Sequence, residues 1–231
     1  MGAYPAGEPD LAESFEATEG GRLWTFKLRE GVQFHGGYGE LKASDVKFTF
    51  DRVRNPDFVS PWLSQFTNVE EILVLDDYTV QVVLEEADPL FLINIAGHTR
   101  GAILNERAVT ELGSAFRTNP IGTGPFQFDD YVSTQSLRVT RFDDYFRADE
   151  AAILEATQFH YGPEVSSLYI GLQRGDYDVA GGVDTRQFAE RTESLGLNVI
   201  SYGLGASVAL SKHHQPHHRC GHHPACLRHP H

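Results

Sequence analysis

The sequence changes character after Leu210, and this break limits the part of the chain that can fold around an apolar core. Eight of the eleven histidines and both cysteines lie beyond it, in the segment SKHHQPHHRCGHHPACLRHPH. That segment has no acidic and no aromatic residue, and its only apolar run is Ala225 to Leu227. Because such a segment has little to bury, we expect residues 211–231 to form a disordered tail. The fold and the function should therefore reside in residues 1–210.

The charge and hydropathy of the chain exclude some partners and locations. The formal net charge is −13, while the hydrophobic content of 41% and the charged content of 22% are ordinary for a globular protein. Nucleic-acid binding relies on clustered Lys and Arg, so we expect no nucleic-acid partner. No apolar run approaches the roughly 18 to 20 residues of a membrane span. The first ten residues lack the basic and apolar parts of a secretory signal, so we expect this chain to carry no signal peptide.

Alternating apolar residues predict strands in the first third of the chain. Trp24, Phe26 and Leu28 alternate with polar residues, which is typical of a half-buried strand. Residues 72–84 read as two strands around Asp76-Asp77, which predicts a β-hairpin. The second strand of this hairpin would present three apolar residues on one face, namely Val80, Val82 and Leu84.

Helix signals alternate with these strands. Ser44 is a candidate N-cap for a helix in which Val46, Phe50 and Val53 recur at helical spacing. Similar start signals occur at Asp88-Pro89, Asn105, Pro163 and Asp184, each before an apolar stretch. The helix predicted after Asn105 extends through Phe116, and the helix predicted from Pro163 ends before Gly175. The mixture predicts an α/β fold, or mixed α+β, in which the hairpin supplies antiparallel pairing.

Residue patterns typical of enzymes and metal sites are scarce before the tail. There is no G-x-S-x-G elbow and no H-E-x-x-H motif. Gly122-Thr123-Gly124 could suggest a phosphate loop, but Pro125 removes a backbone donor, so we interpret the segment as a structural turn. The remaining candidates are isolated histidines and acidic pairs, which we interpret as packing residues, turns and solvated faces: His35, His98, His160, Asp76-Asp77, Asp129-Asp130 and Asp143-Asp144. We therefore predict no catalytic residue, no metal ligand and no cofactor.

A series of motifs resembles, in order, those of the extracytoplasmic solute-binding proteins of peptide-type ABC importers, known as family 5. The matching segments are PDLAESFE (9–16), WTFKLREGVQFH (24–35), LKASDVKFTFDRVR (41–54), DDYTVQVVL (76–84), NPIGTGPF (119–126), RFDDYF (141–146) and LQRGDYDVA (172–180). The resemblance covers about residues 9–210.

The resemblance implies both a fold and a function. Family members enclose a small solute between two hinged lobes, and closure of the lobes delivers the solute to a membrane permease. It implies an incomplete, two-lobed fold like that of the type II periplasmic binding proteins. The expected ligand is a peptide or a similar small solute, and the expected partner of the parent protein is an ABC permease. The parent protein would lie outside the cytoplasm, in the periplasm or at the cell surface.

The motif residues are expected to build the scaffold, and none of them can be assigned to ligand binding. These structural positions are Leu11, Ala12, Glu13, Phe26, Leu28, Arg29, Gly31, Val32, Phe34, His35, Asp45, Val46, Gly122, Thr123, Gly124, Pro125 and Phe126.

The resemblance also suggests a division into domains. Residues 1–15 would open the main lobe, residues 16–117 would form a small domain with the hairpin and helices, residues 118–210 would return to the main lobe, and residues 211–231 would form the tail. Most of the opposing lobe would then be missing. We therefore expect weak or absent ligand binding by this chain alone, and a tendency to aggregate through uncovered apolar surface.

Alternatives remain for both the tail and the protein as a whole. The tail could be a peptide read out of frame, a metal-capturing segment built on its paired histidines and two cysteines, or cloning sequence. The whole protein could instead be an acidic hydrolase that uses a carboxylate pair, or a metal-binding protein that acts through the tail.

Overall fold

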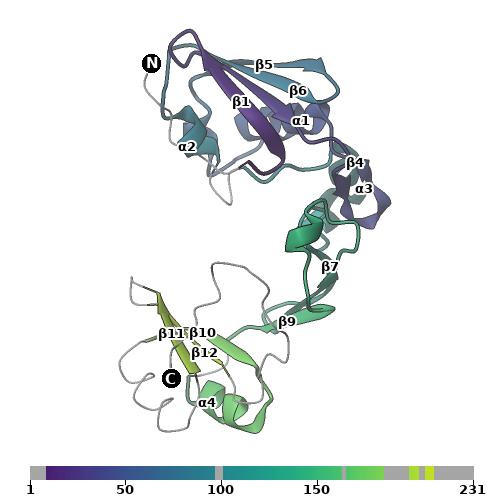
Figure 1. Ribbon diagram of the computed structural model, residues 1–231, viewed down its shortest axis with the longest axis vertical. Helices are drawn as coiled ribbons and strands as arrows, with labels where there is room; N and C mark the ends of the chain where they lie inside the picture. Colours follow the sequence, from purple (N-terminus) through teal and green to yellow (C-terminus); the bar gives the residue numbers. More distant parts are fainter. Residues whose placement is uncertain (1–8, 97–100, 163–164, 185–197, 203–205, 211–231) are drawn as a thin grey trace. The chain divides into compact units, whose positions relative to one another are not determined.

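The computed structural model of the protein describes residues 9–96, 101–162, 165–184, 198–202 and 206–210 (Figure 1). The chain divides after Phe159 into two compact units, residues 1–159 and 160–231. The boundary that we expect after residue 117 falls inside the first unit, so the proposed division into domains stays a prediction. The histidine-rich tail lies outside the described residues.

A four-stranded antiparallel sheet forms the centre of the first unit. Its strands lie in the order β1 (Ala12–Thr18), β2 (Leu23–Leu28), β6 (Thr79–Leu84) and β5 (Val69–Asp76). The side chains predicted to alternate inward on β2 and β6 are all buried. The predicted hairpin is confirmed, and its turn is Asp77-Tyr78, with an Asp76 carboxylate oxygen accepting the Tyr78 N–H at 2.8 Å.

Helix α1 (Ala43–Arg54) packs across one face of this sheet, against β5 and β6 (Figure 1). Val46 and Phe50 are buried in the core and Val53 is partly buried, as the spacing predicts. The predicted N-cap at Ser44 is wrong, because the helix begins two residues earlier with Lys42 as N-cap. The Asp45 carboxylate accepts the Lys42 N–H at 3.0 Å, which is the acidic half of a capping box.

Two short helices pack beside the sheet and beside α1. Helix α2 (Phe91–Ile95) packs Phe91 beside Trp24, with ring centroids 6.0 Å apart. Helix α3 (Glu106–Leu112) has the predicted cap, because the Asn105 side chain accepts the Ala108 N–H at 2.9 Å. It ends before Phe116 because Gly113 takes a φ of 53° and a 3-10 helix follows. The remaining short elements are β3 (Gln33–Phe34), β4 (Gly39–Glu40) and 3-10 helices at His35–Gly37, Leu63–Gln65, Gly113–Arg117 and Ala148–Glu150.

A three-stranded sheet completes the first unit. Its order is β7 (Phe126–Val132), β8 (Ser136–Arg141) and β9 (Ala156–His160). The loop that leads into β7 contributes Ile121 to the same core as the four-stranded sheet.

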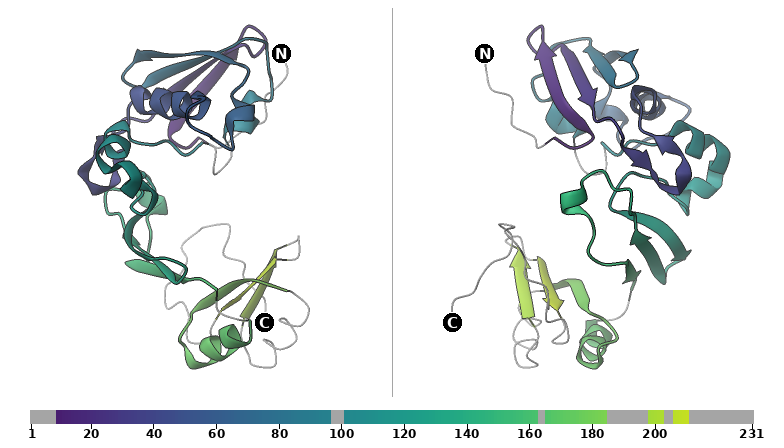
Figure 2. Two further views of the ribbon diagram at one scale, coloured as in Figure 1. Left: turned by 180° about the vertical axis from the view of Figure 1, so that it is seen from behind. Right: turned by 45° about the vertical axis from the view of Figure 1, so that its right-hand side comes forward.

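The second unit has its own small sheet. Its strands lie in the order β10 (Val179–Asp184), β12 (Ala206–Leu210) and β11 (Asn198–Tyr202), with helix α4 (Val165–Arg174) beside β10 (Figure 2). Gly175 ends α4 with a φ of 77°, as predicted. The Tyr177 ring lies so close to Gly171 that a Cβ there would approach the ring within 2.3 Å. The helix predicted after Asp184 falls on residues outside the described part.

Among the described residues, no helix combines the length and the apolar character that crossing a bilayer requires.

The core of the first unit predicts a contrast between two isoleucines. Ile72 on β5 is 2% exposed and Ile153 is 83% exposed. Ile72→Ala should lower the free energy of unfolding by about 2–5 kcal/mol, because it leaves a cavity in the core. Ile153→Ala should change it by less than about 0.5 kcal/mol. Urea denaturation followed by tryptophan fluorescence measures both, and equal effects would contradict the assignment of this core.

Candidate functional site

His35 joins two motif segments that lie far apart in the sequence. Its backbone N–H donates to the Gly122 carbonyl at 2.8 Å, and the Gly122 N–H donates to the ring Nδ1 at 3.3 Å. The ring Nε2 donates to the Gly124 carbonyl at 2.9 Å. The ring also meets Phe142 edge-on, with centroids 4.7 Å apart. The His35 ring is therefore a clasp that fixes the loop leading into β7.

The clasp requires the neutral form of the imidazole. Nδ1 must be unprotonated to accept from Gly122, while Nε2 carries the proton that it donates. His35 is only 5% exposed, and this burial lowers its pKa below 6.5, although the Gly124 carbonyl acts in the opposite direction. Gly122 and Gly124 act here through their backbone atoms, and a Cβ on either residue would meet no close contact.

The Asp45 carboxylate joins the N-terminal ends of α1 and α3. Besides the Lys42 N–H, it accepts the Glu106 N–H at 3.2 Å and the Asn105 side-chain amide at 3.4 Å. Asp45 is 6% exposed, and burial raises its pKa, although the bonds from Lys42 and Glu106 oppose that rise. A buried carboxylate with these donors is a structural connector, because its oxygens are already occupied.

A second polar network surrounds the turn at Gly31. Gly31 has a φ of 80°, and its N–H donates to the Glu40 carboxylate. The Tyr78 hydroxyl donates to Glu40 at 2.8 Å, and Lys42 Nζ lies 3.0 Å from Glu40 and also bonds the Tyr78 hydroxyl. These donors lower the pKa of Glu40, and the Gly31 N–H is the largest cause. The pKa of Lys42 is raised, mainly by its hydrogen bond to Tyr78. The network fastens the Gly31 turn to the hairpin turn.

Two arginines hold the first described residues of the chain. Arg29 donates from Nε to the Asp10 carbonyl at 2.6 Å, and Arg147 pairs with the Asp10 carboxylate at 3.0 Å. Both guanidinium groups lie near the ring of Phe146, with distances to its centroid of 6.0 Å for Arg29 and 5.5 Å for Arg147. At the start of β1, Glu13 pairs with Lys27 at 3.4 Å.

The other predicted motif residues lie in the packing of the first unit. Phe26, Leu28, Val32, Phe34 and Val46 are buried, and Leu11 and Ala12 are partly buried against the same core. Pro125 accepts the Phe142 N–H at 3.0 Å, next to Phe126 at the start of β7. Thr123 is half-buried in the loop between the two glycines.

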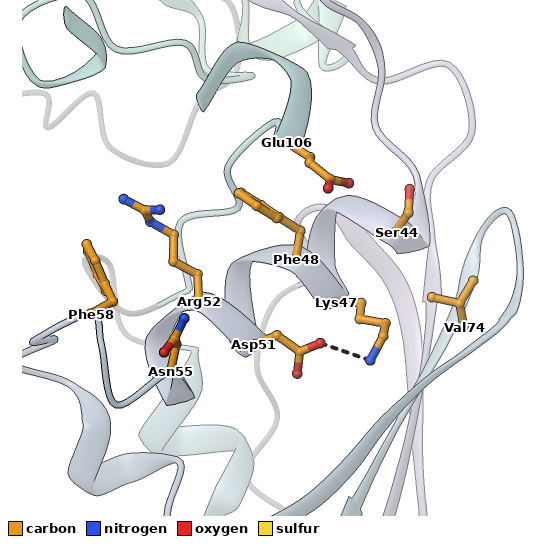
Figure 3. Close-up of a pocket in the computed structure, with 9 residues that line it drawn as sticks. All are labelled: Ser44, Lys47, Phe48, Asp51, Arg52, Asn55, Phe58, Val74 and Glu106. Atoms are coloured by element: carbon orange, nitrogen blue, oxygen red, sulfur yellow. Dashed lines mark ion pairs between the residues drawn. The ribbon is translucent and has the colours of Figure 1, made fainter. Parts of the chain in front are cut away.

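The structure also shows a hollow that the sequence analysis misses. It lies on the outer face of α1, with a volume of about 450 Å³ (Figure 3). None of the individual residues predicted as structural positions lines it, although five lining residues belong to the motif segment 41–54. Its lining residues are Ser44, Lys47, Phe48, Asp51, Arg52, Asn55, Phe58, Val74 and Glu106. The available signal was the spacing of Ser44, Phe48 and Arg52, which lie four residues apart and so share one helix stripe.

The titratable side chains of the described part are not gathered into a reactive cluster. Among these residues, no three His, Cys, Asp or Glu side chains lie close enough to share a metal ion. Asp129 pairs with Arg138 at 2.9 Å and Asp143 with Arg141 at 2.7 Å, while the His160 ring packs beside Tyr177. His98 lies outside the described residues.

Comparisons with known proteins place these segments in a family. The sequence model of the bacterial extracellular solute-binding proteins, family 5 (middle part), matches residues 7–216. The dipeptide-binding protein of Escherichia coli K12 is 29% identical over 214 residues, which cover 83% of this chain and 39% of that protein.

Solved structures give the same result. PBP/SBP MoaA from A. tumefaciens R10, in complex with mannopinic acid, has a TM-score of 0.77 and 28% identity over 84% of this chain and 39% of that one. The oligopeptide-binding protein AppA from Bacillus subtilis, in complex with a nonapeptide, has a TM-score of 0.72 and 27% identity over 83% of this chain and 38% of that one. The predicted resemblance and the mixed fold of the type II periplasmic binding proteins are confirmed. The chain spans about two fifths of the length of these relatives.

The His35 clasp predicts a pH dependence of stability. The folded-state pKa of His35 lies below the ordinary value of 6.5, so the unfolded chain binds this proton more readily. The stabilising effect of the neutral ring is complete above pH 6.5 and is lost as the pH falls from 6.5 toward the folded-state pKa, by at most about 1.4 kcal/mol per pH unit. His35→Gln, which keeps a donor for Gly124 but cannot titrate, should show a smaller slope.

Urea denaturation at pH 7.5, 6.5 and 5.5 measures the difference between the two proteins. Both retain the other ten histidines, so those residues cancel in the comparison. Identical slopes for the wild type and His35→Gln would show that His35 is not the titrating clasp.

Proposed function

Because the chain belongs to family 5 of the bacterial extracellular solute-binding proteins, we propose that it acts in the substrate-binding component of an ABC importer. That protein captures peptides or a similar small solute outside the cytoplasm and presents them to a permease in the membrane. The match over residues 7–216 is the observation that carries this proposal.

The names of the relatives support a peptide as the solute class. The E. coli relative is a dipeptide-binding protein, and the B. subtilis structure holds a nonapeptide. The structure with mannopinic acid is the reason for keeping other small solutes within the proposal. We infer no nucleic-acid partner, because the net charge of −13 would repel a phosphate backbone.

A binding role without chemistry fits the arrangement of the polar residues. His35 and Asp45 are engaged in buried hydrogen bonds. Asp129 on β7 and Asp143, just after β8, each pair with an arginine. A hydrolase would need carboxylates that converge on a substrate, with pKa values displaced for acid and base roles. The described residues do not favour this alternative.

Uptake measurements on a bacterium that carries the gene test the proposal. Deleting the gene should reduce uptake of a labelled dipeptide, tripeptide or nonapeptide severalfold, while uptake of free amino acids stays unchanged. A plasmid copy should restore uptake. Unchanged uptake of all three peptides would contradict the peptide proposal, and lost peptide hydrolysis by the cell envelope would point instead to an enzyme.

A further inference from the structure

The hollow on the outer face of α1 combines an apolar floor with charged walls. Phe48 forms its centre, with Phe58 at one end and Val74 at one side (Figure 3). Its volume of about 450 Å³ lies within the range of about 300–1,000 Å³ that is usual for small-ligand sites. The hollow is therefore large enough for a small amphipathic molecule.

One cation on α1 has no anionic partner. Lys47 pairs with Asp51 at 2.9 Å, and Arg54 donates to the Val69 carbonyl at 2.6 Å. Within the described part of the chain, the Arg52 guanidinium forms neither an ion pair nor a hydrogen bond, and its Cζ lies 4.1 Å from the centroid of the Phe58 ring. A guanidinium that lies over a ring still presents N–H groups at its edge, which suit a carboxylate.

An anion without a partner lies at the other end of the hollow. The Glu106 backbone N–H bonds Asp45, which fixes this residue beside the first turn of α1. In the same described part, the Glu106 carboxylate has no cation or hydrogen-bond donor, and Figure 3 shows Phe48 between Glu106 and Arg52. The two charges of opposite sign thus flank one aromatic ring.

The spacing of the backbone positions along α1 indicates the length of the ligand. Glu106 lies near the Ser44 end of the hollow, and Ser44 and Arg52 are eight residues apart on α1, which corresponds to about 12 Å at 1.5 Å per residue. An extended chain advances about 3.4 Å per residue, so three or four residues cover this distance. A single amino acid would be too short to reach both charges.

We propose that this hollow is a second binding site, which holds a short extended peptide of three or four residues with free termini. The peptide carboxylate pairs with Arg52, its ammonium group pairs with Glu106, and an apolar side chain packs on Phe48. The site is built entirely from the first compact unit, so it does not depend on an enclosing second lobe.

Isothermal titration of the full chain with the tetrapeptide Ala-Leu-Leu-Ala tests the site. We expect weak, saturable binding of the free peptide. Amidation of its C-terminus should weaken binding about fivefold, and acetylation of its N-terminus should do so to the same extent, because an exposed ion pair contributes about 1 kcal/mol or less. Arg52→Gln should weaken binding of the free peptide similarly and remove the effect of amidation. Glu106→Gln should also weaken binding of the free peptide, and it should remove the effect of acetylation.

Matched controls separate this site from binding elsewhere. Lys47 is a cation of the same hollow, but Asp51 already neutralises its charge. In Lys47→Gln, amidation and acetylation of the peptide should therefore still weaken binding as they do in the wild type. Far-UV circular dichroism checks that each variant is folded, which we expect because none of the altered side chains belongs to the buried core. Phe48→Ala should weaken binding of Ala-Leu-Leu-Ala more than that of Ala-Gly-Gly-Ala.

Two results would overturn the site. One is a lack of any binding by the folded wild-type chain. The other is binding whose dependence on the peptide termini is the same in Arg52→Gln and Glu106→Gln as in the wild type. Neither result bears on the proposed transport function, which is measured by uptake in cells.

Discussion

The arrangement of the first unit depends on the hydrogen bonds of the neutral His35 imidazole. Its two ring nitrogens bond a backbone donor and a backbone acceptor of one loop, at Gly122 and Gly124. That loop also places Ile121 in the core and leads directly into β7. The position of the second sheet is therefore set by a side chain 87 residues earlier in the chain.

The family motifs include connectors of this kind. His35, Asp45 and Glu40 would each be candidates for acid–base roles if they were read as isolated residues. In the structure, each is occupied by backbone donors or acceptors from a different segment. A residue whose polar atoms are already engaged in holding two segments together has few left for a substrate. The charges that have no partner among the described residues belong to other side chains, at Arg52 and Glu106.

The periodicity of apolar residues is sufficient to predict elements that bury one regular face. It does not predict features whose position is set by contacts between distant segments. The strand at Trp24 and the hairpin follow from alternation, because one face of each strand is buried. The start of α1 was misplaced at Ser44, since the acceptor that caps the helix is Asp45, which also bonds α3. The hollow could not be predicted, because Val74 and Glu106 come to α1 from a strand and a helix distant in sequence.

The titratable groups that hold these turns and segments also shape how the fold responds to acid. Protonation of His35 removes stability first, below pH 6.5, because its folded-state pKa is lowered. Asp45 has the opposite effect on stability. Its pKa is raised in the folded state, so its protonation at falling pH favours the folded chain. Glu40 and Asp76, whose pKa values are lowered, lose their contributions only at still lower pH. At neutral pH, His35 is uncharged and the carboxyl groups of Glu40 and Asp76 are ionised, so these three groups stabilise the fold fully there, whereas Asp45 opposes them.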